Sequence, residues 1–153
     1  MTAVPPARVP VLMYHEIAEV SEAGSRLAVS PAAFAAQLGY LRGAGFTAMT
    51  ASELSARLAG DLGKLPDRPI VLTFDDGYAD FHSRALPLLD RYGCTATLFV
   101  TTGWVQDADM RLADPGRMLS ATQISEAAGA GVEIGAHTRR HPQLDQLDRK
   151  SVV

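Results

Sequence analysis

Five short apolar runs alternate with segments of helical pattern along this chain, and this alternation limits the fold more than any other feature of the sequence. The runs expected to form strands are Val9–Tyr14, Phe46–Met49, Ile70–Phe74, Thr95–Val100 and Val132–Ala136. Strands that are separated by helices pair in parallel through right-handed crossovers. The 153 residues are also about the length of one domain. The sequence therefore predicts a single α/β domain, residues 1–153, with a parallel sheet of five strands.

Capping residues and glycines mark the ends of the helices between these strands. Helices are expected over residues 31–43, from Thr50 to about Leu58, up to Tyr92, and from Ser120 to Gly129, with a loop over residues 101–118. Ser30 and Pro31 are typical of a helix start, because the hydroxyl accepts a main-chain hydrogen bond and proline lacks the N–H. Pro87 is expected in the first turn of its helix, since a proline deeper inside a helix costs about 3 kcal/mol.

Polar side chains follow three of the predicted strands, at the point where each strand ends. His15 follows the first strand and His137 follows the last one. Asp75 and Asp76 come directly after the apolar run Ile70–Phe74. The carboxyl ends of parallel strands meet at one face of an α/β fold, which is where active sites lie. The sequence therefore predicts a functional site at this face.

The Asp75-Asp76-Gly77 segment has both a structural and a functional explanation. Asp-Gly pairs are common in turns, and an aspartate caps a following helix. Two adjacent carboxylates at the end of a buried strand, however, raise one another's pKa unless a cation is present. A divalent metal ion would resolve this repulsion, with one aspartate as its ligand and the other free to act as a base.

His137 and His141 have the i, i+4 spacing that brings two imidazoles to one metal ion. Pro142 disfavours helical geometry at His141, so the pair is expected on a loop or an irregular turn. Two solvated histidines in a basic turn would explain the segment equally well if it stood alone. Together with the aspartate pair, it favours a catalytic site with two histidines and one carboxylate. This donor set suits Zn²⁺, with Co, Ni, Mn and Fe as alternatives.

Two further histidines receive different interpretations. His15 is either an ordinary loop residue or a general acid, since an unperturbed imidazole pKa of about 6.5 suits proton donation near neutral pH. His82 lies within a predicted helix and is interpreted as a surface residue without a catalytic role.

Charge and composition exclude several other classes of protein. The 14 basic and 17 acidic residues give a net charge of −3, so no basic excess favours a nucleic acid as partner. No apolar run approaches the length of a transmembrane helix, and no export signal is visible at the N-terminus. The single cysteine, Cys94, has no partner for an internal disulfide.

Three segments together resemble the polysaccharide deacetylases, the NodB-homology proteins of carbohydrate esterase family 4. They are TFDDG at 73–77, TLFV at 97–100 and EIGAHTRRHP at 133–142, and the resemblance extends roughly from Val9 to Leu147. It implies a distorted (β/α) barrel and a metal-dependent hydrolase that removes N-acetyl groups from a polysaccharide and releases acetate. The segment VLMYHEI at 11–17 resembles the branch that acts on poly-N-acetylglucosamine.

The resemblance also implies a role for each candidate residue. Asp75 matches the catalytic base of the family. Asp76, His137 and His141 match its metal triad, for which Zn²⁺ is the expected ion. In the poly-N-acetylglucosamine branch the general acid precedes TFDDG in the chain, which implies His15. The family also implies an extracellular or cell-envelope location and an N-acetylated polysaccharide as the partner.

The chain departs from the family pattern after its second motif. A complete barrel needs more strands than the five counted here, and nothing after Pro142 matches the arginine motif that orients the base. The barrel is therefore expected to be incomplete, with its C-terminal segments missing. A catalytically inactive metal-binding or glycan-binding fragment stays an alternative, as does a different metal-dependent hydrolase with the same ligands.

Overall fold

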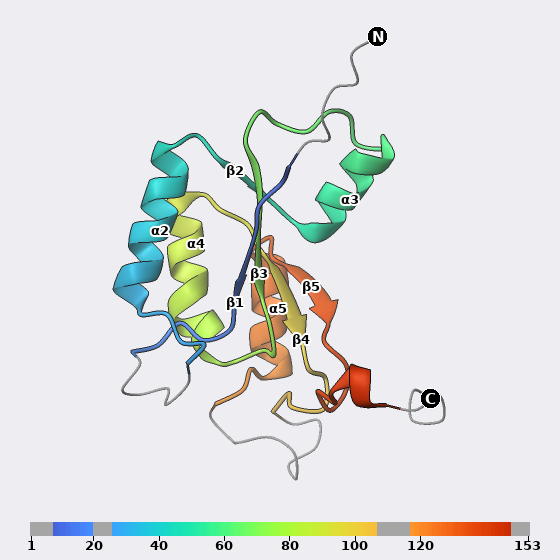
Figure 1. The fold of residues 1–153 in the computed structure, drawn as a ribbon. Coiled ribbons are helices and arrows are strands. Elements are labelled where there is room, and N and C mark those ends of the chain that lie inside the picture. Colours follow the sequence, from blue (N-terminus) through green and yellow to red (C-terminus); the bar gives the residue numbers. More distant parts are fainter. Residues whose placement is uncertain (1–7, 20–25, 107–116, 148–153) are drawn as a thin grey trace.

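The computed structural model describes residues 8–19, 26–106 and 117–147, and its centre is a parallel sheet (Figure 1). The strands are β1 (Val11–Tyr14), β2 (Thr47–Met49), β3 (Pro69–Phe74), β4 (Thr97–Val100) and β5 (Glu133–Ala136). The α-helices are α2 (Pro31–Gly43), α3 (Ala51–Ala59), α4 (Leu86–Tyr92) and α5 (Ala121–Gly129). A π-helical segment, η1 (Phe81–Ala85), precedes α4, and a short 3-10 helix, η2 (Leu144–Gln146), follows β5.

The sheet has the strand order β1-β3-β4-β5, and every pairing in it is parallel. The short strand β2 pairs with the first half of β3, from Pro69 to Val71, whereas β4 pairs with Thr73 and Phe74 in the second half. The five-stranded parallel sheet predicted from the sequence is therefore confirmed, and its C-terminal strand ends point in one direction.

The predicted helix ending at Tyr92 is divided into two parts. The first part is the π-helical segment η1, in which the N–H of Leu86 donates to the carbonyl of Phe81, five residues earlier. Pro87 then lies in the first turn of α4, as expected, because its ring nitrogen has no hydrogen to donate there. Strand boundaries also shift, since β1 begins at Val11 instead of Val9 and β4 at Thr97 instead of Thr95.

Aromatic side chains hold α2 and η1 against the sheet. Phe74 lies 5.7 Å from Phe34 and 4.8 Å from Phe81 between ring centroids, in edge-to-face geometry. Tyr14 completes the cluster at 5.0 Å from Phe34 and 5.2 Å from Phe74. Burying a large apolar side chain of this kind contributes about 1.5–3 kcal/mol. This cluster therefore fixes the ends of β1 and β3, the strands that precede His15 and Asp75.

Helix α3 packs across the opposite end of the sheet from those strand ends. The N–H of Ala51, in its first turn, donates to Thr97 Oγ1 over 2.9 Å, and the N–H of Ser52 donates to Glu133 Oε2 over 3.3 Å. Burial alone would raise the pKa of Glu133, but the hydrogen bonds from Ser52 and Thr97 outweigh burial and lower it. The carboxylate of Glu133 thus joins α3 to β5.

The described sheet is open at both sides. In the part of the chain that the structure describes, β1 pairs only with β3, and β5 pairs only with β4. Val11 and Met13 of β1 are 54% and 62% exposed, and Ile134 of β5 is 37% exposed, as expected for an incomplete barrel. Among the same residues, no helix is long and apolar enough to cross a membrane.

Candidate metal centre

The turn after β3 directs Asp76 toward the interior of the molecule. The N–H of Asp75 donates to the carbonyl of Tyr14 over 2.9 Å, which extends the β1–β3 ladder by one residue. The chain then turns through positive φ angles of 75° at Asp76 and 91° at Gly77. Aspartate and glycine are among the residues that tolerate this left-handed conformation. Asp76 is 6% exposed as a result.

His137 and His141 lie on an irregular turn after β5, as the proline at position 142 predicts. The N–H of His137 donates to the carbonyl of Val100 over 2.8 Å, so the ladder between β4 and β5 continues to the first histidine. Thr138 and His141 have positive φ angles of 65° and 51°. The Thr138 hydroxyl accepts a 2.9 Å hydrogen bond from the N–H of His141, which closes the turn.

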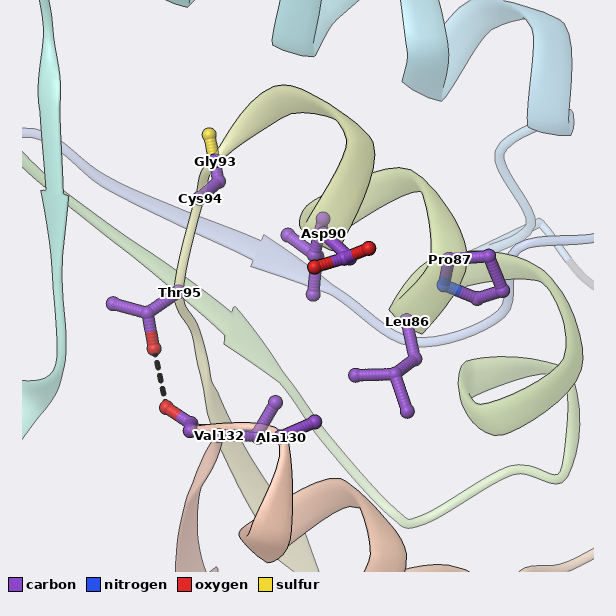
Figure 2. Close-up of a pocket in the computed structure, with 10 residues that line it drawn as sticks. Leu86, Pro87, Asp90, Gly93, Cys94, Thr95, Ala130 and Val132 are labelled. Carbon is purple, nitrogen blue, oxygen red and sulfur yellow. Dashed lines mark hydrogen bonds between the residues drawn. The ribbon is translucent and has the colours of Figure 1, made fainter.

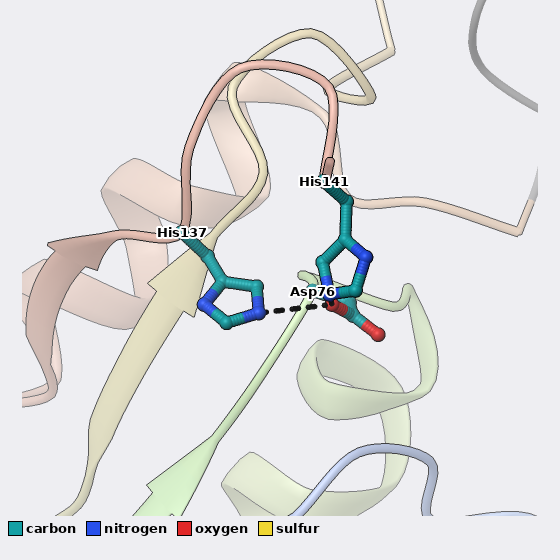
Figure 3. Close-up of side chains that lie close together, drawn as sticks. All are labelled: Asp76, His137 and His141. Atoms are coloured by element: carbon teal, nitrogen blue, oxygen red, sulfur yellow. Dashed lines mark ion pairs between the residues drawn. The ribbon is translucent and has the colours of Figure 1, made fainter. Parts of the chain in front are cut away.

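The side chains of Asp76, His137 and His141 converge at one point (Figure 3). Nε2 of His137 lies 3.5 Å from Asp76 Oδ1, and Nε2 of His141 lies 3.3 Å from it. The ligand atoms of all three residues lie within 4.8 Å of one another. The centroids of the two imidazole rings are 4.9 Å apart, and the ring planes are inclined by 45°.

The chemistry of this cluster fits a divalent cation. Asp76 Oδ1 is buried and has no hydrogen-bond partner within the described part of the chain, because neither histidine contact has hydrogen-bond geometry. A buried carboxylate oxygen without a partner is costly unless something else compensates it. The histidine side chains are 30% and 46% exposed, so one side of the cluster is open to solvent. Two nitrogens, one oxygen and an open side are the pattern of a catalytic metal site.

Asp75 lies beside this cluster in an environment that perturbs its acidity. Burial raises the pKa of the Asp75 carboxyl above its ordinary value. The nearby histidines lower the pKa of Asp75, in the order His137, His15 and His141, whereas the neighbouring Asp76 carboxylate raises it further. All five residues predicted from the strand ends therefore gather at the same end of the sheet.

An ion pair near the site, between a buried glutamate and a partly exposed arginine, was not predicted from the sequence. Glu16 is 4% exposed, and both of its carboxylate oxygens lie 3.1 Å from Nη2 of Arg117. The Arg117 guanidinium also lies 5.3 Å from the centre of the Tyr78 ring. Asp80 Oδ1 accepts a 2.8 Å hydrogen bond from the N–H of Ile17. These contacts attach the segment that follows His15 to the loop that follows Asp76.

Trp104 is a second neighbour that sequence reasoning missed. Its ring centroid lies 5.4 Å from that of His141, with the planes inclined by 31°. The residue falls within the region predicted only as a loop, of which residues 107–116 lie outside the described part. The one available signal was an isolated tryptophan shortly after a buried strand.

His82 and Cys94 lie away from the cluster. Nε2 of His82 is 2.7 Å from Glu126 Oε2, which joins η1 to α5, so the interpretation of His82 as non-catalytic agrees with its position. Cys94 lines an open cleft of about 510 Å³ between α4 and the turn after α5, near the N-terminal end of β4 (Figure 2). Burial raises the pKa of the Cys94 thiol, which makes it a poor nucleophile.

Comparison with known proteins identifies the family of this chain. The sequence profile described as polysaccharide deacetylase matches residues 62–153. The chain therefore belongs to the polysaccharide deacetylase family, whose members are hydrolases acting on amide bonds.

Individual proteins show the same relationship. YxkH of Bacillus subtilis strain 168 is 33% identical over 142 residues, which cover 93% of this chain and 46% of that protein. The poly-β-1,6-N-acetyl-D-glucosamine N-deacetylase of Escherichia coli K12 is 29% identical over 136 residues, covering 83% of this chain and 20% of the relative. Among solved structures, the Streptococcus pyogenes deacetylase PplD in complex with acetate superposes with a TM-score of 0.77 at 28% identity, covering 94% of this chain and 62% of PplD. The chain thus spans less than two thirds of each of these relatives.

Proposed function

We propose that this chain carries the active site of a metal-dependent N-deacetylase that acts on a polymer of N-acetylglucosamine. The observation that carries the proposal is the buried Oδ1 of Asp76, which lies between the Nε2 atoms of His137 and His141 and has no hydrogen-bond partner among the described residues. The name of the Escherichia coli relative, a poly-β-1,6-N-acetyl-D-glucosamine N-deacetylase, supports the substrate class.

Asp76, His137 and His141 would hold one divalent ion, and their donor set favours Zn²⁺. When bound, such an ion supplies Lewis-acid activation of a water molecule and of an acyl oxygen. Asp76 is buried and both histidines are partly exposed, so the three residues would hold the ion with one side open to solvent and substrate.

Asp75 and His15 would move the protons. Asp75 accepts a proton from the attacking water as the oxygen bonds to the acetamide carbon. Burial, which raises the pKa of Asp75, makes this carboxylate a stronger base than a solvated one. His15 donates a proton to the sugar nitrogen as the carbon–nitrogen bond breaks. The products are acetate and a glucosamine unit with a free amine.

The substrate class also supports a location outside the cytoplasmic membrane, in the cell envelope or beyond it. The Escherichia coli relative is named for a polysaccharide, a class of polymer found in the envelope and outside cells. Deacetylation would give the polymer positive charges, and these attract anionic surfaces.

The open sides of the sheet favour a second candidate. Exposed Met13 and Ile134 show that β1 and β5 are uncovered in the described part of the chain. The 153 residues alone would then bind a metal ion or a glycan without catalysing hydrolysis. Segments that cover these edges in a longer protein would restore the activity.

One experiment separates these possibilities. The protein is expressed at the full length of its gene, loaded with Zn²⁺ and assayed for acetate release from an N-acetylglucosamine oligomer. About one ion per chain and measurable turnover are expected, and both should be lost in Asp76→Ala and His137→Ala. Full metal content and wild-type turnover in either variant would show that these residues are not the ligands. Turnover by the full-length protein, together with metal binding but no turnover by residues 1–153 expressed alone, would favour the second candidate.

A further inference from the structure

Thr101 connects the main chains of two candidate metal ligands. It follows β4 directly and is fully buried, with 0% of its surface exposed. Its N–H donates to the carbonyl of Asp76 over 3.1 Å, and its hydroxyl donates to the carbonyl of His137 over 3.2 Å. A single residue therefore sets the position of the loop after β3 relative to the turn after β5.

Gly103 supports the same turn between its two histidines. Its N–H donates to the carbonyl of Arg139 over 2.9 Å. A Cβ atom at position 103 would lie 2.3 Å from that carbonyl oxygen, far inside van der Waals contact. Any side chain at this position would therefore push Arg139 away and move His141 with it.

The turn itself needs external support. Thr138 and His141 both have positive φ angles, which non-glycine residues adopt at a cost that the surroundings must offset. The N–H of Thr102 donates to the carbonyl of Thr138 over 3.0 Å, next to the bonds made by Thr101 and Gly103. Three consecutive residues after β4 thus hold the strained turn.

We propose that Thr101 and Gly103 are positioning residues of the metal centre, which set the separation of Asp76, His137 and His141 without contacting the ion. This proposal rests on the proposed function, because it requires those three residues to be the ligands. Groups that orient metal ligands typically change metal affinity by about 10- to 100-fold when they are removed.

A matched control lies at the opposite end of β4 and β5, just before the two strands begin. The hydroxyl of Thr95 donates to the carbonyl of Gly131 over 2.7 Å, and this bond is the dashed line in Figure 2. The Thr95–Gly131 pair and the Thr101–His137 pair have the same separation of 36 residues in sequence. A Thr→Val change removes the same type of bond at either end, but only position 101 adjoins the candidate ligands.

The test measures the Zn²⁺ affinity of metal-free protein, expressed at the full length of its gene, by calorimetric titration. Thr101→Val should weaken binding by about 10- to 100-fold. Thr101→Ser, which keeps the hydroxyl, should restore most of the affinity, and Thr95→Val should bind like the wild type. Equal affinity in Thr101→Val and wild type, or equal weakening in Thr95→Val, would overturn the role of Thr101.

Gly103→Ala tests the second residue and serves where Thr101→Val does not fold. It should also weaken Zn²⁺ binding, whereas Gly129→Ala, at a position with nothing within 4 Å of an added Cβ, should not. Wild-type affinity in Gly103→Ala would remove Gly103 from the proposal. If the wild-type protein itself binds no Zn²⁺, the proposed function fails and this inference fails with it. If the wild type binds Zn²⁺ and both Thr101→Val and Gly103→Ala bind it equally well, the inference alone is wrong.

Discussion

Replacing Asp76 with asparagine should make the metal-free protein more stable while removing its response to metal. The buried Oδ1 of Asp76 has no hydrogen-bond partner within the described residues, and an unsatisfied buried polar group costs about 1–3 kcal/mol. A neutral amide is less costly to bury than a carboxylate. Asparagine also tolerates the φ of 75° at this position, so the backbone need not change.

The size of the effect follows from these terms. The gain comes only from burying a neutral amide in place of a charged carboxylate, since an oxygen stays at the same place. For a domain of this length, a gain of about 1 kcal/mol corresponds to an increase of about 2–4 °C in Tm. Excess Zn²⁺ at 1,000 times Kd should stabilise the wild type by about 4 kcal/mol and the variant far less. The order of stability of the two proteins should therefore reverse between chelator and Zn²⁺.

Thermal melting with EDTA and with Zn²⁺ checks this reversal. Asp90→Asn in α4, an exposed position, is the control and should change neither melting curve. A variant that is less stable than wild type in EDTA, or that gains as much from Zn²⁺, would refute the reasoning.

Four further predictions concern catalysis, pH and chain length. Asp75→Asn should keep its metal but lose about 10²–10⁴-fold in the rate of acetate release, the usual contribution of a general base, and normal turnover would exclude Asp75. His15→Ala should flatten the falling alkaline limb of the pH–rate profile, and an unchanged profile would return His15 to an ordinary loop residue. Because hydrogen bonds lower the pKa of Glu133 in the folded state, its contribution to stability is present above the unfolded pKa and is lost as pH falls through the folded value. Glu133→Gln should therefore show a weaker loss of stability in acid than the wild type, and parallel acid titrations of the two would contradict this. Residues 1–153 expressed alone should be poorly soluble and inactive, because the outer edges of β1 and β5 have no paired strand among the described residues. A soluble, cooperatively melting, active chain would show that no further strands are needed.

The elements of this fold could be predicted because their signals are local. Thr50 and Glu53 form a capping box within one helical turn, and Ser120 and Gln123 form another, as their spacing predicts. The apolar run that became β3 is buried along its whole length. Asp75 and Asp76 reach the functional face because parallel strands end there, which the order of strands and helices already implies.

The tertiary structure decided what depends on partners far apart in the chain. Glu16 and Arg117 are separated by 101 residues, and no local pattern relates them. Thr101 looks like an ordinary residue at a strand end until its two hydrogen bonds to Asp76 and His137 are seen. The sequence alone predicted which side chains are candidate metal ligands, because motif spacing and the ends of strands can be recognised within short segments. Their convergence within 4.8 Å depends on how separate segments pack, and only the folded chain determines that.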